Sequence, residues 1–206
     1  MGFEQGPDRG PFVTFIYKMT TRFERARKNM PWIDIPKPVE ADTEDEEAGR
    51  RFEGRLDGLY GAELLLGPDT KVLDAHLRLY STLMEGGGGL VRPTRELIAL
   101  SVSSALGCAR SIAIHGAALN EYWKDAEAVD AFAADPAGAI LPPRARRLVD
   151  YALKLTRDPG GMVESDVQGL RQAGLSDAEI LQTAQIAAYT NFIARLMLGL
   201  GMAREY

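Results

Sequence analysis

Three reactive side chains near the middle of the sequence are spaced to share one face of a helix. Cys108, Ser111 and His115 follow one another at intervals of three and four residues, which makes them neighbours on a helix surface. Cys108 is the only cysteine, and His115 is one of two histidines. Glu96 precedes them in a segment that Pro93 is expected to open as a helix. A thiol, a hydroxyl, an imidazole and a carboxylate can therefore converge, which indicates thiol or acid–base chemistry.

Two consecutive helices are expected to position these four side chains. The segment from Pro93 to Leu106 is apolar on nearly every face, which predicts a central and buried helix. A second helix is expected to begin at Cys108 and to end near Trp123. Glu96 lies in the first turn of the first helix, where a carboxylate either stabilises the helix end or reaches the site.

Further helices are expected on both sides of this pair. Apolar periodicity and capping signals predict them over Asp69–Met84, Asp125–Ala134, Pro143–Leu155, Glu164–Gly174 and Ser176–Gly199. No segment alternates strictly enough to be a strand, so the expected fold class is all-α. A weak match between the segments Glu96–Cys108 and Glu179–Asn191 hints at an internal helical duplication.

The N-terminal part differs in character from the rest. Residues 1–30 are expected to form an extension, in which apolar positions from Phe12 to Phe23 predict an amphipathic helix with a basic face. This helix is expected to lie on the domain or on a neighbouring subunit, and a membrane surface is the alternative. The acidic run Asp42–Glu47 is typical of a solvated helix start rather than of a metal site, because no histidine accompanies it.

Composition narrows the class of protein. The net charge of −5 argues against a nucleic-acid-binding protein. A single cysteine cannot form an internal disulfide, which favours a reducing, cytoplasmic setting. No stretch approaches the about 18 apolar residues of a membrane span. The sequence carries no cofactor motif, and we expect neither a cofactor nor a metal.

The second histidine is typical of a structural residue. His76 lies on the apolar stripe of its predicted helix with Leu77 and Tyr80, which favours a hydrogen-bonded core or interface histidine. A position beside the Cys108 site is the alternative.

These residues give the sequence a family resemblance. It resembles the AhpD-like alkylhydroperoxidases, which group with the carboxymuconolactone decarboxylases and carry a Glu, then a Cys-x-x-Cys pair, then a His. Glu96, Cys108 and His115 fall in register with this signature, while Ser111 replaces the second cysteine. Flanking segments such as 74–80 and 150–156 extend the resemblance to the peroxidase-related subset. It implies an AhpD-like helical domain over residues 31–206.

The resemblance also implies roles for the four residues. In such proteins the second cysteine attacks the peroxide, activated by the Glu and His through a proton relay, and the first cysteine closes a disulfide that a lipoyl-bearing partner reduces. Glu96 and His115 are then the relay and Cys108 the resolving thiol, while Ser111 stands in the attacking position. The resemblance further implies a homo-oligomer, a trimer or larger, with a dimer as the alternative.

Several functions stay open at this stage. The first is thiol-dependent alkyl hydroperoxide reduction of the peroxiredoxin type, weak or lost, in which Cys108 forms the sulfenic acid and an external thiol resolves it. The second is a non-redox pseudoenzyme or small-molecule binding module. The third is a Ser111–His115–Glu96 hydrolase triad, although a serine on a helix face lacks the strained elbow that such triads use. Resemblance alone adds a carboxymuconolactone decarboxylase-like lyase.

Overall fold

The computed structural model of this 206-residue chain describes Trp32 and residues 70–202. Its elements are α4 (Thr70–Tyr80), the π-turn η1 (Ser81–Glu85), α5 (Arg92–Leu106), α6 (Ala109–Trp123), α7 (Ala126–Ala134), α8 (Pro143–Arg157), the short 3-10 turn η2 (Pro159–Gly161), α9 (Glu164–Gln172) and α10 (Asp177–Gly199). These described residues contain no strand, and the predicted all-α fold class is confirmed. The expectations for residues 1–30 and Asp42–Glu47, and the expected domain boundary at residue 31, lie outside the described residues.

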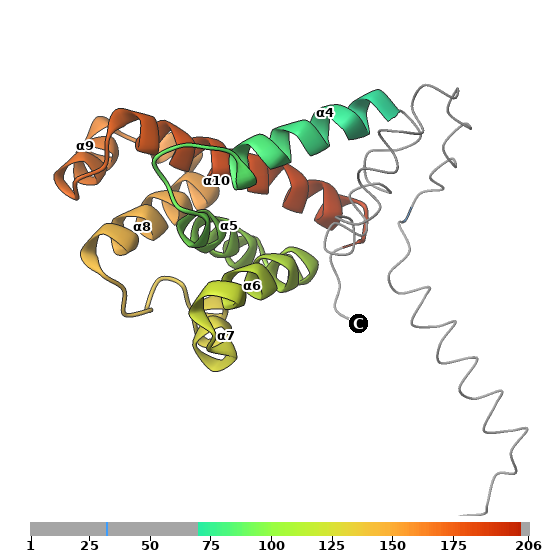
Figure 1. The fold of residues 1–206 in the computed structure, drawn as a ribbon, viewed down its shortest axis with the longest axis horizontal. Helices are drawn as coiled ribbons and strands as arrows, with labels where there is room; N and C mark the ends of the chain where they lie inside the picture. Colours follow the sequence, from blue (N-terminus) through green and yellow to red (C-terminus); the bar gives the residue numbers. More distant parts are fainter. Residues whose placement is uncertain (1–31, 33–69, 203–206) are drawn as a thin grey trace, which may run out of the picture.

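Helix α5 lies at the centre of the fold and packs against α6, α8 and α10 (Figure 1). A proline at its first turn starts it, as the sequence predicts. Ile98, Leu100 and Val102 are fully buried on its successive faces. The predicted central position of α5 is therefore confirmed. Any polar side chain inside this helix needs a partner, because an unpaired buried polar group is strongly unfavourable.

A left-handed turn joins α5 to α6. Gly107 has a φ of 66°, and its amide donates to the carbonyls of Ser103 and Ser104. Glycine adopts this conformation without steric strain, which explains why it ends the helix. Cys108 follows directly as the N-cap of α6, so it begins its helix as expected. Ser111 then lies on the first turn of α6, close to the end of α5.

The end of α4 is held against the rest of the fold through the glycine loop, residues 86–89. Buried Arg95 of α5 donates to the carbonyl oxygens of Leu83, at 3.1 Å, and Leu90, at 2.7 Å. These two carbonyls flank the glycine loop, so one guanidinium holds both of its ends. Gly89 lies so close to the side chain of Glu179 that an added Cβ would overlap it. The loop therefore packs tightly on the start of α10.

The remaining helices begin and end at signals that the sequence predicts. Asp125 caps α7 by accepting from the amide of Ala128. Ser176 and Glu179 form the expected capping box at the start of α10. Gly174, with a φ of 82°, follows the end of α9. Local sequence therefore accounts for most of the helix boundaries in the described residues.

The continuity of helix α10 can be compared with the suggested internal duplication. In that weak match Asn191 corresponds to Cys108, at the point where α5 and α6 are separated by Gly107. Helix α10 runs through Asn191 without a break. The duplication stays a prediction, with no matching break in α10.

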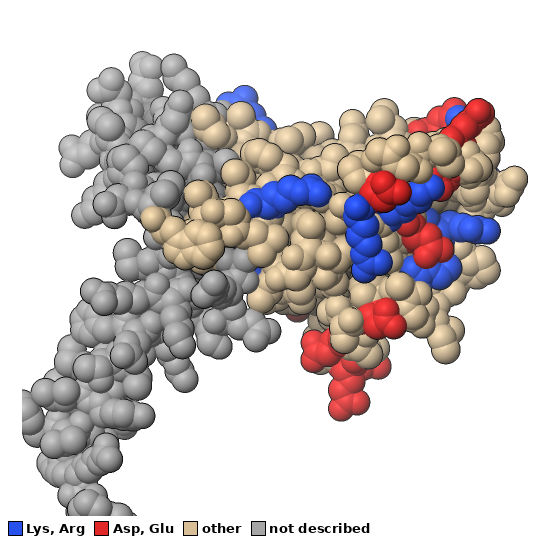
Figure 2. All heavy atoms as spheres, turned by 180° about the vertical axis from the view of Figure 1, so that it is seen from behind, with Lys and Arg blue, Asp and Glu red and all other residues tan. Residues whose placement is uncertain are grey.

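Charged side chains gather at the end of the molecule formed by α8, α9 and the start of α10 (Figure 2). Among them, Lys154 pairs with Asp166 at 2.7 Å, and Arg171 pairs with Asp177 at 2.8 Å. The two signs are intermixed there, and an exposed pair such as Arg171–Asp177 contributes little to stability.

Candidate active site

Glu96 and His115 form a buried pair between α5 and α6. The Glu96 carboxylate is fully buried, and its Oε2 lies 2.7 Å from Nδ1 of His115. His115 is itself only 7% exposed. The structure therefore brings together two of the four predicted site residues, from separate helices. The expected place of Glu96 in the first turn of α5 is wrong, because α5 begins at Arg92 and its first turn holds no acidic residue.

A second chain of contacts leaves Glu96 in the opposite direction. Nε of Arg92 donates to Oε1 of Glu96 at 2.5 Å, and Nη2 of Arg92 donates to the hydroxyl of Tyr80 at 3.2 Å. Arg92 also lies 3.8 Å from the Glu85 carboxylate. The described residues thus form a continuous polar network from His115 through Glu96 and Arg92 to Tyr80.

The network fixes the protonation state of Glu96. Burial raises the pKa of its carboxyl group, but the hydrogen bonds and charges of His115 and Arg92 outweigh that effect and hold the pKa below its ordinary value of 4.5. An ionised carboxylate can only accept hydrogen bonds. Nδ1 of His115 must therefore carry the hydrogen, which leaves Nε2 as a hydrogen-bond acceptor when the ring is neutral.

The Ser111 hydroxyl forms a hydrogen bond with another serine. Its Oγ lies 2.7 Å from Oγ of Ser103, and Ser103 donates to the carbonyl of Ala99 at 2.8 Å. Because each hydroxyl has one hydrogen, Ser111 must be the donor to Ser103. A hydrolase triad needs the opposite arrangement, with the serine hydrogen directed to the histidine. The structure therefore does not support the Ser111–His115–Glu96 triad.

A small cavity of about 20 Å³ lies between α6 and α10 and is bordered by the end of α4. Its walls are formed by Tyr80, Ser111, Ile114, His115, Tyr189, Thr190, Ile193 and Met197. A cavity of this size holds about one water molecule. Ser111 and His115 therefore face the same small space, where a small reactant can contact both.

Cys108 lies outside this cavity. Its side chain is fully buried, and its Sγ is 3.8 Å from Sδ of Met197. Burial raises the pKa of the thiol, an effect that the Ser111 amide and the nearby Arg110 charge only partly offset. The structure thus gives Cys108 the surroundings of a packing residue with a protonated sulfur.

Labelling of the Cys108 thiol should therefore be slow in the folded protein. We expect an aromatic disulfide reagent to label the thiol far more slowly in native wild-type protein than in urea, with a rate that rises as pH increases through the raised thiol pKa. Spectrophotometric labelling at several pH values measures both rates. Native labelling as fast as that of the unfolded chain would mean that the thiol is accessible.

His76 is a hydrogen-bonded structural residue and also lies close to the site. It is buried, its ring stacks on that of Tyr189, and its Nε2 lies 3.2 Å from the Tyr189 hydroxyl. Burial lowers the pKa of His76, which favours the neutral ring. The hydrogen-bonded core histidine is confirmed. Because Tyr189 lines the cavity, His76 also supports the wall of the site.

Three members of the site were not foreseen from the sequence. Arg92 could have been found, because it stands four residues before Glu96 on the same helix. Tyr80 and Ser103 carry no comparable local signal, since their partners lie on other helices or across the α5–α6 turn. No group of three His, Cys, Asp or Glu side chains that could hold a metal occurs in the described residues. Nor does any helix among them have the length and apolarity to cross a membrane.

The candidate site lies in the part of the chain that matches a known family model. The model of the carboxymuconolactone decarboxylase family matches residues 70–153, which include Glu96, Cys108, Ser111 and His115. A sequence comparison with curated proteins gives no significant match.

Solved structures give the same relationship at the level of the fold. An uncharacterized peroxidase-related protein from Silicibacter sp. TM1040 is 27% identical, with a TM-score of 0.73 over 84% of this chain and 90% of that one. An uncharacterized peroxidase-related protein from Ralstonia eutropha JMP134, described as an alkylhydroperoxidase AhpD core, is 25% identical, with a TM-score of 0.72 over 85% and 93%. The chain thus has an AhpD-like fold and peroxidase-related structural neighbours.

A more distant neighbour shares the fold alone. The debrominase Bmp8, solved in complex with 2,3,4-tribromopyrrole, is 15% identical, with a TM-score of 0.66 over 82% of this chain and 91% of that one. The same helical framework therefore occurs at very low sequence identity.

Proposed function

We propose that this is a peroxidase-related protein that keeps a proton relay for a small hydroperoxide while its thiol-dependent reduction of that hydroperoxide is weak or lost. One observation carries the proposal. Ser111 faces the cavity beside His115, whereas the single thiol, Cys108, is fully buried against Met197.

The chemistry explains why the serine matters. In thiol-dependent reduction a thiolate sulfur attacks one oxygen of the hydroperoxide, the O–O bond breaks, and the departing alkoxide takes a proton to become an alcohol. The sulfur becomes a sulfenic acid, which a second thiol converts to a disulfide with release of water. A serine hydroxyl cannot be oxidised in this way. The Glu96–His115 pair can still accept or deliver a proton, but Ser111 supplies no sulfur.

Charge in the site favours a neutral ligand. The cavity is lined by no lysine or arginine side chain. The nearest cation of the network, Arg92, already faces the carboxylates of Glu96 and Glu85. A hydroperoxide is neutral at physiological pH, whereas a carboxymuconolactone-type substrate carries a carboxylate that needs a free cation. The site therefore fits a peroxide-type ligand better than a decarboxylase substrate.

Wild-type turnover tests this proposal. We expect the consumption of hydrogen peroxide in the presence of a dithiol to be no faster with the wild-type protein than with Cys108→Ala. The buried, protonated thiol provides the reason. Consumption followed by a colorimetric peroxide assay, with both proteins at equal concentration, measures the difference. A strong dependence on Cys108 would instead support the single-thiol peroxidase.

A non-redox binding module on the same fold is the second candidate. The hydrogen bond that the Ser111 hydroxyl donates to Ser103 favours it, because a hydroxyl held in this way does not direct its hydrogen to His115. A homo-oligomer, and a thiol or lipoyl-type reductant for any active form, remain part of the proposal.

A further inference from the structure

We propose that Tyr80 is a ligand-binding residue of this site, whose hydroxyl group, oriented by Arg92, donates a hydrogen bond to an oxygen atom of the ligand. The inference rests on the proposed function and adds to it a second polar contact in the cavity that His115 lines. It also defines the ligand as a small neutral molecule that combines an O–H group with a neighbouring acceptor oxygen.

The direction of the hydrogen bond between Arg92 and Tyr80 is the first step. A guanidinium group has only donors, so the Tyr80 hydroxyl oxygen must accept the bond from Nη2 of Arg92. The hydroxyl hydrogen of Tyr80 is then available for another partner. Among the described residues it has no acceptor within hydrogen-bonding distance, and Tyr80 lines the cavity.

The other polar groups of the cavity act as acceptors. Ser111 donates to Ser103 and Thr190 donates to the carbonyl of Ile186, so both present only oxygen lone pairs to the cavity. Nε2 of His115 is also an acceptor in the neutral ring, because Nδ1 donates to Glu96. The hydroxyl of Tyr80 therefore provides a hydrogen-bond donor in a cavity whose other polar groups are acceptors.

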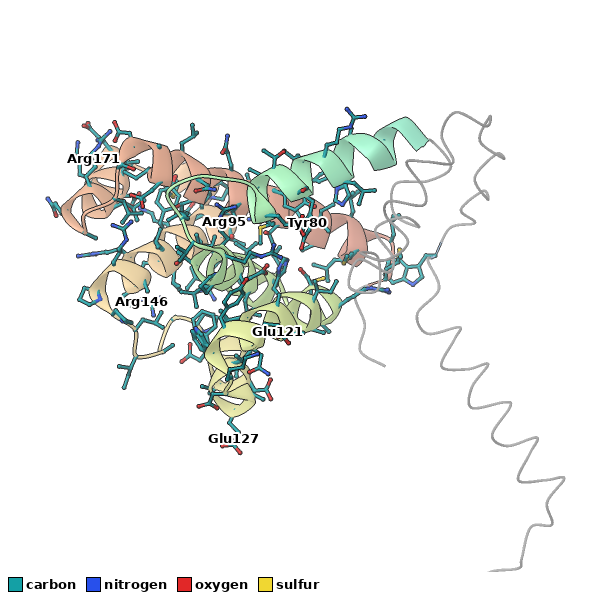
Figure 3. All side chains as sticks on the ribbon, viewed as in Figure 1. Tyr80, Arg95, Glu121, Glu127, Arg146 and Arg171 are labelled. Atoms are coloured by element: carbon teal, nitrogen blue, oxygen red, sulfur yellow. The ribbon has the colours of Figure 1, made fainter. Side chains whose placement is uncertain are left out.

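The protein holds Tyr80 in its protonated form and in one place. Burial and the nearby Glu96 carboxylate raise the pKa of the phenol, although Arg92 partly opposes this. Tyr80 is the last residue of α4, directly before the π-turn η1, and lies on the side of α4 that faces the rest of the fold (Figure 3). Its ring also packs against that of Tyr189, with a distance of 6.3 Å between the ring centroids. The donor is thus set in position before any ligand binds.

These contacts define the ligand by its hydrogen bonds. An O–H group can donate to Nε2 of His115, and an adjacent oxygen can accept from the hydroxyl of Tyr80. The hydroperoxide group, O–O–H, carries both functions on neighbouring atoms. Hydrogen peroxide is the smallest such molecule, and it suits a cavity of about 20 Å³.

A binding titration tests the role of Tyr80 without any redox turnover. Hydrogen peroxide is added to Cys108→Ala protein, which has no oxidisable thiol, and the backbone amide signals of α6 are followed by NMR. We expect Tyr80→Phe in this background to weaken binding about threefold to tenfold, the effect of one lost hydrogen bond. The matched control is Tyr122→Phe, which removes the same hydroxyl from a ring that is 52% exposed on α6, and which should leave the affinity unchanged.

The outcomes separate this inference from the proposed function. Equal affinity in the parent and Tyr80→Phe proteins, with unchanged affinity in the control, would overturn the role of Tyr80 and leave the proposed function standing. Absence of any saturable change in the parent would overturn both. Weaker binding in Tyr80→Phe with an unchanged melting temperature would support a contact to the ligand, because a purely structural role would not alter the affinity alone.

Discussion

Ser111→Cys is expected to raise the dithiol-dependent consumption of hydrogen peroxide well above the wild-type background. The new thiol would replace a hydroxyl that faces the same cavity as His115. Deprotonation by a positioned base typically contributes about 10²- to 10⁴-fold to a rate, and the Glu96–His115 pair is already in place to provide it. A colorimetric peroxide assay on wild-type and variant proteins measures the gain.

Two control variants identify the source of that gain. Ser111→Cys combined with His115→Ala should lose about 10²-fold or more relative to the single variant, because the base is absent. Ser104→Cys adds a second thiol on α5 outside the cavity lining and should leave consumption at the background level. If the Ser111→Cys protein is no more active than Ser104→Cys, the site has diverged beyond one substitution, and the binding-module function becomes the better one.

Glu96→Ala is expected to destabilise the protein by about 3–5 kcal/mol. The carboxylate is fully buried and bonds to both Arg92 and His115, and the removal of one member of a buried pair leaves the other without a partner. The free energy of unfolding is measured by urea denaturation. Glu121→Ala is the matched control, since it breaks a pair with Lys124 in which both side chains are largely exposed.

The contribution of Glu96 also depends on pH. Its folded-state pKa lies below the ordinary value of 4.5, so the unfolded chain binds a proton first as pH falls. The stabilisation is therefore present above about pH 4.5 and is lost as pH falls through the lower pKa of the folded state. The difference in unfolding free energy between wild type and Glu96→Gln should shrink over this range. A difference independent of pH would mean that the charge of Glu96 contributes nothing.

Local sequence predicts much of the fold and part of the site. The proline start of α5, Gly107 between the helices and the capping box at Ser176 all act within a few residues, and each forms as expected. The convergence of Glu96 and His115 also follows from sequence, because the segments that carry them are consecutive helices joined by one tight turn.

Other features depend on helices that are distant along the chain. Burial of Cys108 results from its contact with Met197 on α10, which no local pattern predicts. Tyr80 reaches the site only because η1 and the glycine loop fasten the end of α4 to the fold, with Arg95 holding the loop. Sequence spacing suggested Ser111 as a partner for His115, but the hydroxyl turns to Ser103 across the α5–α6 turn.

The intact mass after brief treatment with hydrogen peroxide tests the central claim most directly. Cys108 and Ser111 lie three residues apart at the start of α6, so a thiol at position 111 would be a neighbour of Cys108 on the same helix face and close enough to form a disulfide with it. We expect Ser111→Cys protein to lose the mass of two hydrogen atoms, and the wild-type protein to keep its reduced mass. A variant that stays reduced, or a wild-type protein that gains oxygen at Cys108 equally fast, would contradict the account.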